Sequence, residues 1–462
     1  MFAVALTASL AVGVTAAMAP SKVDVRIPLA SDPLVVRFVE EALERSPDAA
    51  RIRLTVQAER DRVPQVGSLP DPTLTLGIQN DGFQSIQIGK MDTSFWQVML
   101  TQPIPWPGKL GAHEEVVRAQ ANVTEAQLER WRLSTVAEVE RAYVELLLVR
   151  EQLGLLSELA ALWKEAEAIA RTRYEVGQVS QSDLLRAQLE RTRLEQQRIA
   201  SVSLERTKLH DLNALRVRGL DEPIPTKRTL EELAEPPLRS EEEALVDAAR
   251  QSPDLRVALL SVTAAEKGLD SARQDWLPDL SVSAGVMPRG QIEPMWAVQI
   301  GITLPVFGAT KQSKAVAENV NRREADARGA DAIRLLVLVR ARERRTLLAA
   351  TLETVQLYRG GLLVQSDAAV RSTLAQYKVG KVSFPSVLEV LRGFILDEGG
   401  YLDALAGLQR IGIADREVSL APLGSMGGAL AGGTTIPGVS TAATGGPEAT
   451  VPASGSGAPS GM

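Results

Sequence analysis

The sequence predicts a mainly α-helical protein in which long antiparallel coiled-coil helices carry a small transmembrane β-barrel, with four strands from each chain. Three observations support this fold class. The two halves of the chain repeat the same motifs in the same order, which indicates an internal duplication. Long stretches are rich in Ala, Leu, Glu, Arg and Gln, a composition typical of long helices. Four short segments alternate apolar and polar residues, as strands do.

The composition of the chain narrows the classes of function that it can serve. Hydrophobic residues make up 45% of the 462 residues and charged residues 23%, which is typical of an ordered protein. The net charge is −6, and no Lys/Arg cluster is interleaved with aromatic residues, so we expect no nucleic-acid partner. There is no cysteine, and the two histidines, His113 and His210, stand in charge-rich segments where histidine is usually a surface residue. We therefore expect no catalysis, no cofactor and no metal site.

The N-terminal residues are typical of a secretory signal peptide. An apolar run from Phe2 to Val14 is followed by the small-x-small cleavage site Ala17-Met18-Ala19, so we expect a signal peptide at residues 1–19. No other stretch of the sequence reaches the ~20 apolar residues that a membrane-spanning helix requires. An exported chain of this kind would have to cross a membrane with strands.

Four motifs of the first half recur in the second half, in the same order and at a nearly constant spacing. This recurrence predicts a first repeat at residues 33–217, a linker at 218–239 and a second repeat at 240–420. Residues 421–462 are rich in Gly, Ala, Thr, Ser and Pro, which is typical of a disordered tail. The matched motifs are Arg45-Ser46-Pro47-Asp48 with Gln251-Ser252-Pro253-Asp254, Leu69-Pro70-Asp71 with Leu277-Pro278-Asp279, Thr101-Gln102-Pro103-Ile104 with Thr303-Leu304-Pro305-Val306, and Tyr174-Glu175-Val176-Gly177-Gln178-Val179-Ser180 with Tyr377-Lys378-Val379-Gly380-Lys381-Val382-Ser383.

Three helices are expected in each repeat. The first helix is expected at about 32–66 and 240–275, the very long second helix at about 110–172 and 309–375, and the return helix at about 181–217 and 384–416. An apolar stripe on the first long helix indicates antiparallel coiled-coil packing, with a shift of phase near Arg150. The stripe runs through Val136, Val139, Tyr143, Leu146 and Leu153, and resumes in a shifted phase at Leu156, Ala160 and Trp163.

Two strand-like segments stand between the first two helices of each repeat. Their alternation also fits a half-buried sheet of a soluble protein, but export and a length near the ~9–11 residues that a bilayer requires favour a barrel. Trp96 and Trp296, near the strand starts, fit either an interfacial aromatic girdle or ordinary packing. Because four strands leave open edges that only closure removes, at least two chains must share one barrel. The predicted apolar face carries Leu74, Leu76, Ile78, Trp96, Val98, Leu100, Leu280, Val282, Ala284, Val286, Val298, Ile300, Ile302 and Leu304.

Over nearly its whole length, about residues 33–420, the chain resembles the TolC-like outer-membrane efflux proteins. The most specific sign is the pair of Tyr-x-Val-Gly-x-x-Ser turns at the ends of the long helices. The resemblance implies a homotrimer with a twelve-stranded barrel in the outer membrane of a Gram-negative-type cell, continued by a helical barrel through the periplasm. It also implies a periplasmic adaptor protein and an inner-membrane transporter as partners. Two segments are similar to the heavy-metal branch of the family: Gln102-Pro103-Ile104-Pro105-Trp106-Pro107-Gly108-Lys109-Leu110 and Leu69-Pro70-Asp71-Pro72.

Local physical chemistry accounts for the two glycine turns. Gly177 and Gly380 suit the left-handed position that ends a helix. Ser180 and Asp183 fit a capping box, and Ser383 with Pro385 fits an N-cap followed by a first-turn proline. In the family such turns form the periplasmic tip that docks the adaptor, and this role is compatible with a well-formed turn. By that resemblance the docking residues would be Val176, Gly177, Gln178, Val379, Gly380 and Lys381.

Just beyond each turn, members of the family carry acidic residues whose rings constrict the pore. Asp183 matches such a position in the first repeat, whereas Ser386 replaces the first acidic residue of the second repeat and Glu389 occupies the next. A ring of three Glu389 carboxylates would favour cations by electrostatics. The alternative interpretation, a solvated helix charge, stays open.

Four methionines lie in or near the strands: Met91, Met99, Met287 and Met295. Thioethers are soft ligands for Cu(I). Methionine more often serves as an adaptable hydrophobe, so the sequence assigns no metal site.

From these expectations we predict that the protein is the outer-membrane channel of a tripartite efflux system. Substrate would be driven by an inner-membrane pump and would leave passively through this channel. Heavy-metal cations are one candidate substrate. Two alternatives remain. The exit channel of a type I protein-secretion system has the same fold. A periplasmic coiled-coil scaffold without a channel would leave the alternating strands unexplained.

Overall fold

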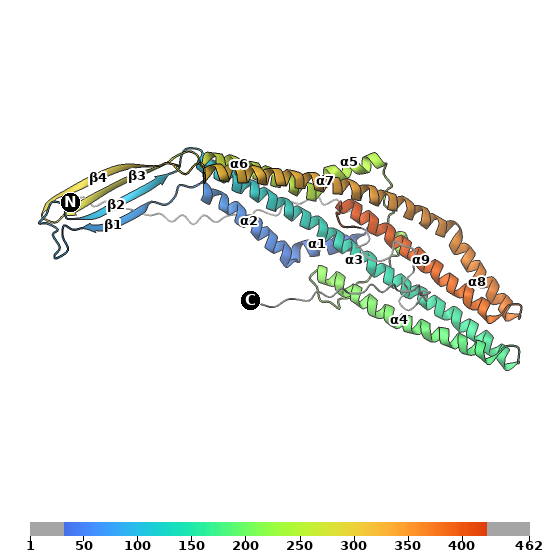
Figure 1. Ribbon diagram of the computed structural model, residues 1–462. Coiled ribbons are helices and arrows are strands. Elements are labelled where there is room, and N and C mark those ends of the chain that lie inside the picture. The colour runs from blue at the N-terminus through green and yellow to red at the C-terminus, as the bar shows by residue number, and fades with distance from the viewer. Residues whose placement is uncertain (1–31, 423–462) are drawn as a thin grey trace, which may run out of the picture.

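The computed structural model describes residues 32–422 as an elongated chain, with a sheet at one end and long helices running away from it (Figure 1). The described part is mainly helical with four antiparallel strands, which confirms the predicted helical fold with four strands, while the closed barrel stays a prediction. The predicted signal peptide at residues 1–19 and residues 423–462 of the predicted tail lie outside the described residues.

The elements of the first half of the chain recur in the same order in the second half. The first half has α1 (Pro33–Arg45), α2 (Pro47–Gly67), β1 (Thr73–Gln79), β2 (Phe95–Ile104), α3 (Lys109–Glu175) and α4 (Gln181–Leu215). The 3-10 turn η1 (Leu230–Glu232) lies between the halves. The second half has α5 (Glu241–Gln251), α6 (Pro253–Gln274), β3 (Asp279–Arg289), β4 (Ile292–Thr303), α7 (Gln312–Leu357), the π-helix η2 (Tyr358–Leu362), α8 (Leu363–Lys378) and α9 (Phe384–Glu417).

The first helix of each half is broken in two, where the sequence predicted one helix. Ser46 separates α1 from α2, and Ser252 separates α5 from α6. Each serine precedes a proline, which disfavours helical backbone at the serine, and each hydroxyl caps the next helix. Ser46 Oγ accepts from the Ala49 amide at 3.4 Å, and Ser252 Oγ accepts from the Leu255 amide at 3.2 Å.

The second long helix is also interrupted, although the sequence predicted a continuous helix at about 309–375. Its first-half counterpart, α3, runs unbroken for 67 residues. Between α7 and α8 the backbone forms the five-residue π-helix η2, which contains Gly360 and Gly361. Two adjacent glycines weaken the α-helical hydrogen-bond ladder, and π-helical turns of this kind are rare.

The sheet has the order β1-β2-β3-β4, with all neighbours antiparallel, so that β2 pairs with β3 across the two halves. Within the described residues, β1 and β4 each have a strand neighbour on one side alone. None of the helices in residues 32–422 is both long enough and apolar enough to cross a membrane.

The hydrophobic core follows α3. Tyr143 and Leu146 are fully buried, and the Tyr143 ring packs edge-on against Phe38 of α1 at 6.3 Å between ring centroids. The connection between the halves contributes Ile224 and Leu230 to this cluster. Farther along α3 the predicted stripe is correct at Leu156 and Trp163, but Leu159 is buried in place of Ala160, which is exposed.

Candidate functional site

The strand register collects the apolar side chains of the sheet on one face. Leu76 lies opposite Val98, which lies opposite Val286, which in turn lies opposite Trp296. These side chains are exposed: 71% of Leu76 and 75% of Trp296 are accessible. Soluble monomers rarely expose an apolar patch that spans a whole sheet. The alternation that the sequence predicted is therefore present, and its apolar face is uncovered in the single chain.

The opposite face of the sheet carries small and polar side chains. Thr101 and Ser283 share a hydrogen bond of 2.9 Å between their hydroxyl oxygens. Gly285 lies where a Cβ would come within 2.6 Å of the Val98 carbonyl oxygen, so β2 and β3 approach closely there. On the two central strands, β2 and β3, residues on this face are more enclosed than those on the apolar face. The other residues that share it are Thr73, Thr75, Gly77, Gln79, Phe95, Gln97, Met99, Pro103, Asp279, Ser281, Met287, Met295, Ala297, Gln299, Gly301 and Thr303.

A buried lysine ties the sheet to the helices at the junction of the two halves. The Lys109 ammonium group, at the first residue of α3, donates to Asp279 Oδ1 of β3 at 2.9 Å. The Trp106 amide donates to the same oxygen at 3.0 Å. The lysine lies in the segment that resembles the heavy-metal branch, but its aspartate partner was not apparent from the sequence because 170 residues separate them.

The two predicted tips are the turns between α3 and α4 and between α8 and α9. Gly177 and Gly380 have φ of 75° and 79°, as predicted for the left-handed position after a helix. The Gln178 amide donates to the Arg173 carbonyl oxygen and the Gly177 amide to that of Tyr174. The second turn makes the equivalent pair of bonds, from Lys381 and Gly380 to Gln376 and Tyr377. Both turns are Schellman motifs, and all six predicted docking residues are exposed.

An arginine joins the two tips. Arg173, near the end of α3, donates from Nη1 to the Tyr377 carbonyl oxygen of α8 at 3.0 Å, and its guanidinium lies 4.9 Å from the centroid of the Tyr377 ring. Tyr377 is fully buried and packs against Phe384 of α9. Burial raises the pKa of the Tyr377 hydroxyl, and the Arg173 cation acts in the opposite direction. No local pattern in the sequence indicates this contact, since its partners are 204 residues apart.

The predicted capping box at the first tip is wrong. Ser180 is the N-cap of α4, but its hydroxyl makes no cap hydrogen bond and instead lies 2.6 Å from the hydroxyl of Ser182. The second tip has the predicted N-cap Ser383 with Pro385 in the first turn of α9, again without a side-chain cap.

The three predicted constriction residues lie at the starts of the return helices. Asp183 is half-buried in the first turn of α4, Ser386 is half-buried in the first turn of α9, and Glu389 is exposed one turn later. The Ser386 hydroxyl lies 3.3 Å from that of Ser383. Their role in a pore stays a prediction.

A central ion-pair network joins the halves at mid-length; it consists of Arg130, Arg141, Arg416, Glu140, Glu417 and Asp254. Glu417, at the end of α9, accepts from Arg130 at 3.2 Å and from Arg141 at 2.8 Å. Arg416 donates to the buried Glu140 at 2.7 Å. Burial raises the pKa of Glu140, and the Arg416 charge opposes this shift. The network was not predicted from the sequence.

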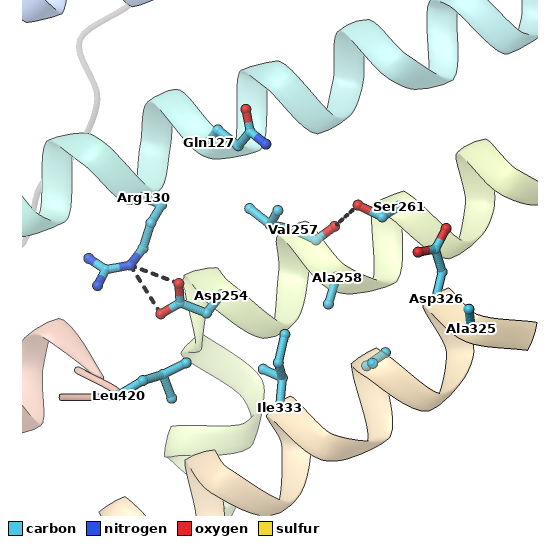
Figure 2. A pocket seen from close by; sticks show the side chains of 12 residues that line it. Gln127, Arg130, Asp254, Val257, Ala258, Ser261, Ala325, Asp326, Ile333 and Leu420 are labelled. Atoms are coloured by element: carbon cyan, nitrogen blue, oxygen red, sulfur yellow. Dashed lines mark hydrogen bonds and ion pairs between the residues drawn. The ribbon is translucent and has the colours of Figure 1, made fainter. Parts of the chain in front are cut away.

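A cavity of about 420 Å³ lies beside this network, between α3, α6 and α7 (Figure 2). Arg130 and Asp254 form an ion pair at one end, with Arg130 Nε 3.0 Å from both carboxylate oxygens. Ala258, Ala330 and Leu420 line the apolar remainder. In the described residues, no three His, Cys, Asp or Glu side chains are grouped so that they could hold a metal ion.

Comparison with known proteins gives matches over most of the chain. The family model described as outer membrane efflux protein matches residues 38–217 and 244–395. The outer-membrane channel OprN is 19% identical, with 84% of this chain and 91% of that chain covered at a TM-score of 0.73. CusC, solved in a study of folding and transmembrane channel formation, is 16% identical, with 84% and 92% covered at a TM-score of 0.72. The open MtrE outer membrane channel of Neisseria gonorrhoeae is 18% identical, with 84% and 89% covered at a TM-score of 0.69.

The four-stranded sheet and the long helical hairpins are thus the fold of an outer-membrane channel protomer. The chain belongs to the outer membrane efflux protein family. The resemblance carried by the twin turns is confirmed, while the heavy-metal branch stays a prediction.

Proposed function

We propose that this protein is the outer-membrane duct of a tripartite efflux system, in which three copies close a twelve-stranded barrel and their helices form a tube through the periplasm. The observation that carries the proposal is the sheet itself. It has a continuous exposed apolar face, a polar opposite face, and two edges that lack a strand neighbour within the chain.

The energetics of the sheet favour lipid on one side and water on the other. Moving a Leu, Ile or Val side chain from water into hydrocarbon is favourable by roughly 1.5–3 kcal/mol. Such side chains occur on all four strands of the apolar face. The amide and carbonyl groups of the β1 and β4 edges require partners in a membrane, and strands of further copies supply them.

The tips support docking of a periplasmic adaptor. Their backbone is fixed by two Schellman motifs and by Arg173, so Val176 and Val379 are presented in a defined geometry, with 63% and 68% of each exposed. An exposed valine on a fixed turn is a suitable apolar contact for a partner that meets several tips at once. The inner-membrane transporter that drives the substrate would act through this adaptor.

Heavy-metal cations are the cargo that the junction sequence favours, because residues 102–110 resemble that branch of the family. Passage itself requires no chemistry from the duct, so the protein acts as a passive conduit.

The test is conductance combined with a matched pair of strand variants. The protein purified in detergent should migrate as a trimer and give discrete conductance steps in a planar bilayer. Leu76→Lys puts a charge on the apolar face, at a cost of about 2–4 kcal/mol at the bilayer midplane, and should abolish insertion. Thr75→Lys puts the same charge on the polar face and should insert with altered ion selectivity. A monomer without conductance, or equal tolerance of both lysines, would contradict the proposal.

A further inference from the structure

Three methionines lie close together on the polar face of the sheet, where large apolar side chains are otherwise rare. Met287 of β3 is directly opposite Met295 of β4. Met99 of β2 is opposite Gly285, two residues from Met287 on the same face. Directly opposed residues have Cβ atoms about 4.5–5.5 Å apart, and diagonal neighbours lie within reach of long side chains. The register therefore brings three thioethers into one neighbourhood.

The orientation of Met99 supports this grouping. Its sulfur lies 3.9 Å from Nε2 of Gln97, so the side chain extends toward the Gln97 end of β2. Continuing the register of β2 and β3 by one residue places Gln97 beside Met287. Met99 is the most enclosed residue of its strand, at 9% exposure, and Gly285 opposite it leaves the space above β3 free of a side chain.

Packing alone does not explain these methionines. Leu, Ile, Val and Trp of the central sheet stand on the apolar face, whereas the neighbours of the three methionines are Thr, Ser, Gln, Gly and Ala, with Arg289 two residues from Met287. Thioether sulfur is a soft ligand that favours Cu(I) and the chemically similar Ag(I) over hard cations. The nearby Arg289 is engaged with the Glu293 carbonyl oxygen at 2.8 Å and with Asp92, so its charge has partners of its own.

We propose that Met99, Met287 and Met295 form a transient site for a soft monovalent cation, Cu(I) or Ag(I), on the inner wall of the duct. This inference rests on the proposed function, because the polar face must line the passage. Neutral thioethers bind such a cation without the charge of a thiolate. Weak binding of this kind is suited to a conduit, since a cation that is held tightly does not leave.

The experiment is silver block of single-channel conductance in nitrate salts, which avoid precipitation of silver by chloride. Silver nitrate should lower the potassium conductance of the wild-type channel. The triple variant M99L/M287L/M295L, which replaces each sulfur with a similar apolar volume, should keep the potassium conductance but require about tenfold more silver for the same block. The matched control is Met91→Leu, in the loop between β1 and β2, which should behave as wild type.

The outcomes separate this inference from the proposed function. A channel that conducts but is not blocked by silver, or a triple variant that is blocked as readily as wild type, would overturn the methionine site and leave the duct intact. A protein that never conducts would overturn the duct. In that case silver binding to the detergent-solubilised protein by calorimetry, compared between wild type and the triple variant, still decides whether the site exists.

Discussion

Two valines at equivalent ends of the return helices have backbone conformations that valine rarely adopts. Val217 follows α4 with φ of 53°, and Val418 follows α9 with φ of 50°. A β-branched side chain at positive φ is strained. Both residues end their helices with the same pair of backbone bonds that glycine makes at the tips. The strain is tolerated twice, at positions 201 residues apart in the numbering, because the helix end must turn sharply there.

Replacing these valines with glycine should have opposite effects. Val217 is 44% exposed, so Val217→Gly should relieve strain and raise the free energy of unfolding by about 1 kcal/mol. Val418 is buried among Val337 and Ala341, so Val418→Gly should lower it by about 1–2 kcal/mol, since lost packing outweighs the relieved strain. Denaturant unfolding of both variants measures the difference. Equal shifts of the same sign would show that backbone strain does not govern these positions.

Glu41 makes the stability of the protein sensitive to acid. Hydrogen bonds from Arg218 and Arg216 hold the pKa of Glu41 at about 2, against burial, which acts in the opposite direction. Because the folded-state pKa is depressed, the stabilisation is present above the unfolded pKa near 4.5 and is lost as the pH falls through about 2. The stabilisation at neutral pH is on the order of 3 kcal/mol.

Unfolding of wild type and Glu41→Gln at pH 6 and pH 3 tests this dependence. Wild type should lose more stability than Glu41→Gln over this interval. Glu195→Gln is the control, because Glu195 is an exposed partner of Arg198 and such pairs contribute little. If wild type and Glu41→Gln lost stability in parallel, Glu41 would not be the acid-sensitive group.

At the scale of elements, η2 is the feature that distinguishes the second long helix from the first. Its Tyr358 packs against Gly400 of α9, where an added Cβ would clash with the phenol ring. Its Arg359 donates to the Tyr401 hydroxyl at 2.9 Å and to Glu235 of the inter-repeat connection at 2.7 Å. The irregular turn is therefore fixed by contacts on two sides, which fits a defined bend rather than a loose segment.

Alanine substitutions in η2 and in the facing helix α9 should have opposite effects on stability. Gly360 has no atom within 4 Å of its would-be Cβ, so Gly360→Ala should stabilise the helix by about 0.5–1 kcal/mol. Gly400→Ala should destabilise the protein by about 1–3 kcal/mol, because Tyr358 must move. Thermal unfolding compares them. A stable Gly400→Ala protein would indicate that Tyr358 has room to shift.

Two substitutions at the first tip test whether docking depends on the backbone conformation of the turn. Asparagine at position 177 tolerates the left-handed conformation, whereas valine adopts it only under strain, as at Val217 and Val418. Nothing lies within 4 Å of a Cβ at this position, so the Cβ of neither variant meets a steric clash within the chain. We expect Gly177→Asn to retain efflux and Gly177→Val to lose it, with the trimer still inserted. Unchanged efflux in Gly177→Val cells would count against docking at this tip.

Local patterns in the sequence predicted the strands and turns well and the long-range contacts poorly. Leu74, Leu76 and Ile78 alternate with polar residues, and alternate residues of a strand point to the same face. The apolar face of the sheet could therefore be predicted from the sequence alone. The Ser-Pro motif does signal the breaks at Ser46 and Ser252, because a proline disfavours helical backbone at the residue before it. The stripe failed at Ala160 because a long coiled coil drifts relative to its partner.

At the scale of the whole molecule, the unpredicted long-range contacts share one cause. Arg130 contacts Glu417, 287 residues away, and Arg173 contacts Tyr377. Such contacts exist because α9 returns beside α3 and because the two hairpins share one buried cluster around Trp163 and Phe384. No local period in the sequence carries that information. The same cluster packs the two hairpins against each other along the length that leads to the tips.

The two unpaired edges of the sheet also have a genetic consequence. If each edge of the sheet pairs with a strand of a neighbouring copy, one defective copy prevents its neighbours from closing the barrel. If the protein is the trimer proposed above, random mixing of equal amounts of normal and edge-blocked chains gives about one assembly in eight with normal chains alone. An allele that blocks the outer edge of β1 but leaves β4 competent to pair would therefore be dominant over the wild-type allele. An allele that prevents export of the chain would be recessive, because its product never meets the normal copies.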